Sequence, residues 1–332
     1  MLSGIILVLG SDYARAQEVS EYVAEKPETP AEGKALGWDP ILKMSSNIAF
    51  SHNRKVVGNP DGANWNLGFL LNSGLCFLNE GGHSWENALK WQLNYTRTSV
   101  IDRLIKSLDA LEFTSTYFYH IPSIKWLGPF ASLVLNTSVF PGYDVRPEDT
   151  VVRRLDIAGK EVSIETIAAE DDIELTKAFA PTVFKQSVGV FADAVNKKPI
   201  KVNIRAGASA WEVFGQNGYI VADDAATPEL DLRVIQDSAM FGSGLILTAS
   251  GEIKTNLIYN SKAEFMYPFM HNAETDLSGI DILNIEFDFL LGVKLAEWAS
   301  LDYTVKAYRL PFISEDWQVH NGLLLSLTAN II

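Results

Sequence analysis

The residues best suited to catalysis or metal binding lie at spacings that do not favour either chemistry. The five histidines are His52, His83, His120, His271 and His320. None forms the His-Glu-x-x-His pattern or the i, i+4 pair that brings two imidazoles to one metal ion. We therefore expect no metal site and no cofactor, and we interpret these histidines as surface groups.

Two candidate nucleophiles, Ser243 and Cys76, are also weak. Gly242-Ser243-Gly244 holds part of a nucleophile elbow, but strand-like sequence surrounds it where an elbow needs a strand, a turn and a helix. Cys76 is the only cysteine, which excludes an internal disulfide and a thiolate metal cluster, and we interpret it as a packed thiol. We expect no enzyme, and a membrane-embedded lipid hydrolase is the weakest alternative.

Charged residues form a clearer pattern, because they recur at every second position between apolar ones. Lys262 and Glu264, for example, share one parity, while Ala263 and Phe265 share the other. Successive side chains of a strand point to opposite faces, so these charges share a face and can pair across strands about 4.8 Å apart. The candidates for this polar face are Lys90, Glu112, Arg205, Lys262, Glu264, Glu286, Asp288, Lys294, Asp302 and Lys306.

The strands that would carry these residues are unusually long. Most reach the roughly 9–11 residues that cross a bilayer as a tilted strand, whereas ordinary strands average about 5–6. A transmembrane barrel turns its apolar face to lipid and its polar face to a lumen, and a soluble sheet does the reverse. We predict an all-β fold, a single transmembrane antiparallel β-barrel of about twelve strands at residues 41–51, 65–78, 85–97, 108–120, 126–140, 182–191, 201–213, 232–250, 253–269, 280–295, 301–308 and 317–331.

Connection lengths and tryptophan positions support the membrane interpretation. Connections alternate between short ones, such as 79–84 and 121–125, and long ones, such as 142–181 and 214–231. Outer-membrane barrels have short periplasmic turns and long external loops, and a periplasmic N-terminus would put every short connection on the periplasmic side. Six tryptophans lie near predicted strand ends, where aromatic belts meet the membrane interface: Trp65, Trp85, Trp126, Trp211, Trp298 and Trp317.

The N-terminal region and the overall charge predict export. Residues 1–16 hold an apolar run followed by small residues, as in a cleaved signal peptide, and the missing basic region predicts a start further upstream. Residues 17–39 are acidic with few large apolar groups, which predicts a periplasmic linker before a barrel at 40–332. The net charge of −14 argues against nucleic acid as a partner. We expect the outer membrane of a Gram-negative bacterium, with its lipid as the first partner.

The longest connection, residues 142–181, is rich in carboxylates. Its pattern predicts a small hairpin formed by 150–156 and 161–167, followed by a helical turn within 170–180. External loops of this size often serve as lids or partner surfaces. We interpret this one as a solvated external rim.

Several segments resemble an uncharacterised domain-of-unknown-function family of Gram-negative outer-membrane barrels. They are residues 82–87 (Gly-His-Ser-Trp-Glu-Asn), 106–112 (Lys-Ser-Leu-Asp-Ala-Leu-Glu), 140–144 (Phe-Pro-Gly-Tyr-Asp) and 316–319 (Asp-Trp-Gln-Val). The chain departs from such families at its end, which is Asn-Ile-Ile where they place an aromatic residue. The resemblance implies the fold and the outer membrane, and it supplies no activity.

The function we expect first is a narrow pore or transporter for small polar or charged solutes. The inward charges could pair and fill the lumen or could line a hydrated passage, and the sequence leaves both open. The alternative from a different class is a non-conducting barrel whose external loops scaffold a surface or periplasmic protein partner.

Overall fold

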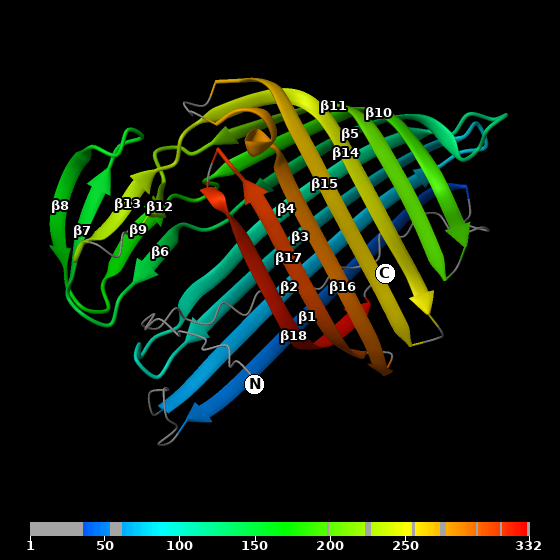
Figure 1. Cartoon of the computed structure of the whole chain (residues 1–332). Coiled ribbons are helices and arrows are strands. Elements are labelled where there is room, and N and C mark those ends of the chain that lie inside the picture. The colour runs from blue at the N-terminus through cyan, green and yellow to red at the C-terminus, as the bar shows by residue number, and fades with distance from the viewer. Residues whose placement is uncertain are drawn as a thin grey trace, which may run out of the picture.

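The computed structural model describes residues 36–53, 62–197, 199–222, 227–253, 256–272, 277–296, 298–312 and 314–330. The expected signal peptide and nearly all of the expected linker lie outside these residues. Twelve long strands form one barrel in the order β1-β18-β17-β16-β15-β14-β11-β10-β5-β4-β3-β2 (Figure 1). They are β1 (Gly37–Asn53), β2 (Gly62–Leu78), β3 (His83–Arg97), β4 (Ile105–Tyr119), β5 (Leu127–Thr137), β10 (Thr182–Lys197), β11 (Ile200–Phe214), β14 (Ser238–Ile253), β15 (Leu257–His271), β16 (Asn284–Ala296), β17 (Ala299–Leu310) and β18 (Ser314–Asn330).

Every neighbouring pair in the barrel is antiparallel, as predicted. β1 pairs with β18 from Lys43↔Asn330 to Ser46↔Leu327, so the first strand meets the last and the barrel closes. This seam consists of four residue pairs, in which the backbone groups of the two strands satisfy each other as a bilayer requires. Of the described helices, none is long and apolar enough to cross a membrane.

The two ends of the barrel differ in their connections. Short turns such as 79–82 and 120–126 lie at one end, here called the turn end. The segments 138–181 and 215–237 lie at the other, here called the loop end. Two predicted strands need correction: 232–250 divides between β13 (Leu230–Val234) and β14, and 280–295 opens with a short 3₁₀ helix, η1 (Gly279–Ile282), before β16.

Side-chain exposure shows that the barrel is apolar outside. On β10, Val188 and Val190 are 57% and 53% exposed, whereas Lys185 on the opposite face is 6% exposed. A soluble barrel would reverse these values, and only lipid favours an apolar outer surface of this kind. The chain is therefore a transmembrane β-barrel of the outer-membrane type. Other exposed apolar residues on the wall are Leu75, Tyr117, Leu133, Phe241, Leu245, Leu247, Leu301, Tyr303, Val319 and Leu327.

Most tryptophans lie at the two ends of this apolar surface, as interfacial belts require. Trp38, Trp85, Trp126 and Trp298 are exposed near the turn end, and Trp65 and Trp317 are exposed near the loop end. The expectation for Trp211 was wrong. Its side chain points into the lumen and is 3% exposed.

The backbones of β10 and β11 lie in close contact at two glycines. Gly189 and Gly207 are cross-strand partners, and a Cβ on Gly189 would lie 2.1 Å from the carbonyl oxygen of Ala206. A Cβ on Gly207 would lie 2.0 Å from the carbonyl oxygen of Val188. Only glycine permits this approach at the two positions.

The long connections at the loop end fold into two small sheets, which Figure 1 shows projecting from the barrel. Residues 142–181 supply β6 (Gly142–Val145), β7 (Thr150–Leu155), β8 (Glu161–Ile167) and β9 (Asp172–Thr176). Residues 215–237 supply β12 (Tyr219–Val221) and β13. One sheet has the order β12-β13-β7-β8, and β6 pairs with β9. We call these two sheets the external sheets.

The external sheets have their own apolar core, which corrects the expectation of a solvated rim. Val152, Ile173, Leu230 and Leu232 are buried together there. The predicted hairpin is confirmed as β7 and β8, while the predicted helical turn is wrong, because Asp172–Thr176 is the strand β9. Ile173 explains the difference, since a strand places its side chain in this core.

One ion pair joins the two connections inside the external sheets. Arg153 on β7 donates from Nε and from one terminal nitrogen to the two carboxylate oxygens of Asp231 on β13, both at 2.7 Å. The hydrogen bond from Arg153 is the main cause that lowers the pKa of Asp231 below its ordinary value. Arg103, in the connection between β3 and β4, also pairs with Asp172 on β9. The sheets are thus held to a third loop.

Candidate functional site

The predicted polar face gathers its charges on three neighbouring strands, β15, β16 and β17. Lys262 on β15 is the register partner of Asp288 on β16, and Asp288 is the partner of Lys306 on β17. Opposite charges directly opposite each other stabilise a strand pair. The register therefore places these three charges side by side across strands, while Oδ1 of Asp288 has no hydrogen-bond partner among the described residues.

The next row of the wall places two like charges together. Glu264 on β15 is the register partner of Glu286 on β16. Like charges in this position destabilise a sheet unless a cation compensates them. Lys262 contributes one such cation, with its Nζ 2.8 Å from Oε2 of Glu264.

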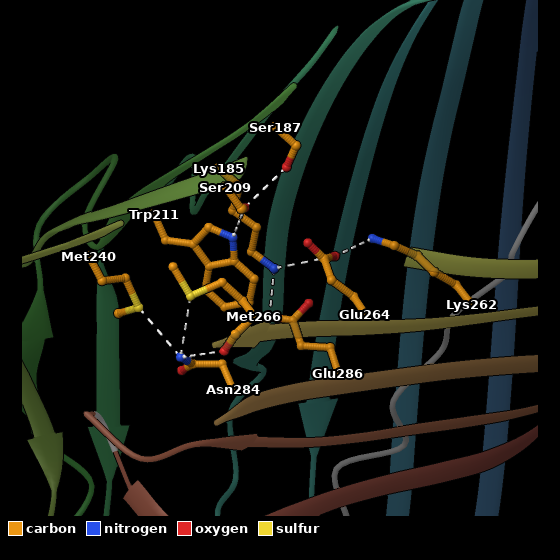
Figure 2. A network of polar contacts seen from close by, with 10 residues as sticks. All are labelled: Lys185, Ser187, Ser209, Trp211, Met240, Lys262, Glu264, Met266, Asn284 and Glu286. Atoms are coloured by element: carbon orange, nitrogen blue, oxygen red, sulfur yellow. Dashed lines mark hydrogen bonds and ion pairs between the residues drawn. The ribbon is translucent and has the colours of Figure 1, made fainter. Parts of the chain in front are cut away.

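The second cation comes from a more distant strand of the wall, β10, and was missed by the sequence interpretation. Lys185 on β10 extends its Nζ to 2.6 Å from Oε1 of Glu286 and to 3.9 Å from Oε2 of Glu264 (Figure 2). In the barrel order β11, β14 and β15 separate β10 from β16. The Lys185 side chain therefore crosses part of the lumen and does not run along the wall.

Burial makes this network strong. The side chains of Lys185, Glu264 and Glu286 are 7%, 6% and 16% exposed, and that of Lys262 is 34% exposed. Charges shielded from water interact several times more strongly than charges at a surface. They also lose hydration, so each must keep its partner. We call these four residues the lumen bar.

Trp211 forms an aromatic wall beside the lumen bar. It is the register partner of Lys185, and the Nζ of Lys185 lies 4.0 Å from the centroid of its ring. The indole Nε1 donates to Oγ of Ser209 at 3.1 Å, and this hydroxyl lies 3.1 Å from that of Ser187. These hydrogen bonds hold the ring with its face toward the ammonium, the geometry of a cation–π contact.

An apolar cluster covers the lumen bar toward the loop end. It consists of Trp211, Met240 and Met266, with Leu310 and Phe312 packed against them. Asn284 is buried in it, with its Nδ2 3.5 Å from Sδ of Met240 and 3.4 Å from the carbonyl oxygen of Met266. Figure 2 shows Trp211 beside Lys185, with Met266, Asn284 and Met240 on the side of the ring away from the carboxylates.

A second apolar cluster lies toward the turn end, formed by the buried rings of Phe118, Phe130 and Phe191. The ring of Phe191 also contacts that of His120, with centroids 4.9 Å apart. Parity predicts an interior that is polar throughout, and this is wrong. The charged layer is instead bounded along the barrel by apolar side chains at both ends.

The remaining candidates divide into two groups. Lys90 and Glu112 are register partners, and Glu112 interacts electrostatically with Lys262 and Lys306 across the lumen. Arg205 interacts electrostatically with Glu264, and its buried Nε has no hydrogen-bond partner in the described part of the chain. These three residues extend the charged layer around the barrel.

Two candidates lie apart from this layer. Lys294 is half exposed near the turn end, 3.9 Å from a carboxylate oxygen of Glu252. Asp302 is buried but accepts a hydrogen bond from Ser300 at 2.9 Å and stands opposite Gly292. The charged layer thus contains eight of the ten candidates.

The described residues hold no cluster of three or more histidine, cysteine, aspartate or glutamate side chains arranged to bind a metal ion. What the lumen bar can do is attract and position small charged groups. Its two carboxylates and the adjacent Trp211 ring favour cations, and its two ammonium groups favour anions.

No protein-family model matches this chain, and no curated protein does either. Among solved structures, it is similar to the translocator domain of the autotransporter NalP from Neisseria meningitidis, at 7% identity and a TM-score of 0.38 over 90% of this chain and 89% of that one. It is also similar to an outer-membrane channel from Pseudomonas putida F1, at 8% identity and a TM-score of 0.41 over 90% and 97% of the two chains. Likenesses this distant carry no inference about solute, partner or activity.

Proposed function

We propose that this barrel is a narrow pore or transporter for small polar or charged solutes, gated by the lumen bar. The observation that carries the proposal is the contact between Lys185 and Glu286 across the lumen. Barrels of about eight strands are filled by side chains, while those of 16–18 leave an open channel. A barrel of twelve strands lies between these sizes, so individual side chains decide whether it is open.

A solute that passes must displace the Lys185 side chain, because the residue extends from β10 to the carboxylates of β15 and β16. The wild-type barrel should therefore conduct weakly. Neutralising Lys185 removes the ion pair that holds the bar in place and should increase conductance.

Planar-bilayer recordings test this proposal. We expect Lys185→Gln to raise single-channel conductance several-fold above the wild type. Lys160→Gln is a matched control, because it removes the same charge from an exposed position between β7 and β8. Equal and negligible conductance in all three proteins would overturn the pore proposal.

One observation favours the second candidate, a barrel that scaffolds a surface partner. Within the described residues β8 pairs only with β7, so one side of it is an open strand edge. Val162 and Ile164 on this strand are 63% and 53% exposed. Open edges with exposed apolar side chains accept an added strand from a partner. A non-conducting barrel would make this function the better proposal.

Two further expectations stay predictions. Membership in the uncharacterised family of outer-membrane barrels rests on the short segments that resemble it. The lipid hydrolase would involve His320, whose side chain lies outside the described part of the structure.

A further inference from the structure

We infer that Trp211, Glu264 and Glu286 form a binding site for a primary alkylammonium ion, which the ammonium group of Lys185 occupies in this structure. The inference deepens the proposed function, since it names the class of solute that the lumen bar would recognise. The ligand would take the place of a side chain that the protein itself supplies.

The contacts of the Lys185 ammonium define the site. One carboxylate oxygen of Glu286 lies at 2.6 Å, one of Glu264 at 3.9 Å, and the Trp211 ring centroid at 4.0 Å. The ring is 3% exposed and Glu264 is 5% exposed, so the site is largely removed from water. Aromatic faces bind organic ammonium ions in proteins, and the two carboxylates add a charge attraction that is strong where water is excluded.

The chemistry of the walls selects among cations. Mg²⁺ and Ca²⁺ require six or more oxygen ligands, and a tryptophan ring cannot replace them. The alkyl part of an amine would follow the path of the Lys185 methylenes beside the Trp211 ring, which packs on its own against Met240 and Met266. An anion would meet two carboxylates and the negative face of a ring. A primary amine with a short apolar chain satisfies all of these surfaces.

Occupation by Lys185 explains how binding and gating could be linked. A tethered ammonium competes with free amines at a high effective concentration, which is of the order of mM for short flexible linkers. A free amine should therefore bind the wild type weakly. When it does bind, it displaces Lys185 and with it the side chain that crosses the lumen.

Chemical rescue tests the site. Lys185→Ala removes Cγ, Cδ, Cε and Nζ, which together correspond to n-propylammonium. We expect n-propylammonium to bind the purified Lys185→Ala barrel in detergent at least tenfold more tightly than the wild type, as measured by calorimetric titration. Neutral n-propanol, which has the same shape, should not bind measurably.

The aromatic wall supplies the matched variant. In the Lys185→Ala background, Trp211→Leu should weaken n-propylammonium binding about tenfold, because it removes the cation–π contact. Equal affinity of the wild type and Lys185→Ala for n-propylammonium would overturn the site, as would equal affinity of Lys185→Ala for the amine and the alcohol. No effect of Trp211→Leu would also overturn it.

Folding gives a second readout if Lys185→Ala is too unstable to purify. Its refolding yield in detergent should then rise with n-propylammonium chloride and not with sodium chloride or n-propanol. Absence of that rescue would overturn the inference. Neither readout needs conduction, so a barrel that binds n-propylammonium but never conducts refutes the pore and leaves the site intact. A conducting barrel without binding or rescue does the opposite.

Discussion

Glu264 on β15 and Glu286 on β16 stand opposite each other in the barrel wall, and the ammonium group of Lys185 lies 3.9 Å from the first carboxylate and 2.6 Å from the second. Two buried carboxylates at neighbouring positions repel each other. Lys185 therefore does more than occupy space in the lumen. Its positive charge offsets this repulsion where the row of the wall forms.

The first prediction concerns stability. Lys185→Met keeps the length of the side chain but leaves Glu286 buried without its cation, and removing one partner of a buried pair costs about 3–5 kcal/mol. We expect this loss in the free energy of unfolding, measured by urea titration in lipid vesicles. Adding Glu286→Gln should recover part of it, because the uncompensated charge is then gone. A double variant as unstable as Lys185→Met would contradict this account.

The second prediction concerns the lipid face. Val188 is 57% exposed in the middle of β10, so Val188→Arg places a charge against the hydrocarbon and should cost roughly 2–4 kcal/mol. Val162→Arg is the matched control, because Val162 is 63% exposed on the external sheets, in water. Refolding into vesicles should be impaired only by the first change. Equal impairment would show that Val188 does not face lipid.

The barrel strands are largely predictable from the sequence. A strand that separates lipid from a lumen alternates apolar and polar residues along its whole length. The structure contains all twelve predicted barrel strands. The error in the predicted strand 232–250 arises where apolar residues have another cause than lipid. Leu230–Val234 is apolar because Leu230 and Leu232 pack in the external sheets. Parity alone cannot distinguish that core from the membrane.

The site is predictable only in part. Lys185 has the opposite parity to the exposed Val188 and Val190, which places its side chain inside the barrel. Trp211 has the same parity as Arg205 and Ser209, which places its side chain on the polar face. A position near a strand end, however, fits an interfacial belt as well as a lumen wall. The contact between Lys185 and Glu286 could not be predicted, because parity gives the face of a residue and not its neighbours across the lumen.

The third prediction concerns pH and the external sheets. The hydrogen bond from Arg153 lowers the pKa of Asp231, so the ionised carboxylate stabilises the folded sheets. This stabilisation is complete above the unfolded pKa of about 3.9 and is lost as pH falls through the lower folded pKa. Pepsin should therefore cut residues 142–181 of the wild type only as pH falls below about 4.

Asp231→Asn provides the control for this prediction, because it removes the titrating group. Its external sheets should be cut at similar rates at pH values just above and below 4. A wild type whose cleavage follows the same pH profile as Asp231→Asn would show that this ion pair does not set the acid stability.

The fourth prediction concerns topology. If the loop end faces outward, trypsin added to intact cells should cut first after Lys160, which is exposed in the turn between β7 and β8. Lys197 is equally exposed but lies at the turn end of β10 and should be protected in sealed cells. Lys160→Gln should abolish the early fragment. Preferential cleavage within 193–199 would reverse the assignment of the two ends.

The last prediction separates two carboxylates of β16 that both point inward. Glu286 holds the Lys185 ammonium at 2.6 Å, whereas Asp288 faces Lys262 and Lys306 in the neighbouring row. If the lumen bar closes the passage, Glu286→Ala should release Lys185 and raise conductance several-fold in planar bilayers.

Asp288→Ala leaves the lumen bar in place. It should mainly shift the reversal potential in a salt gradient in the direction of anion selectivity, since it removes a negative charge from the lumen wall. Equal increases in conductance for both variants would mean that total charge, and not the bar, limits passage. No change in conductance or reversal potential for either variant would remove both carboxylates from any role in permeation, and the scaffold function would then be favoured.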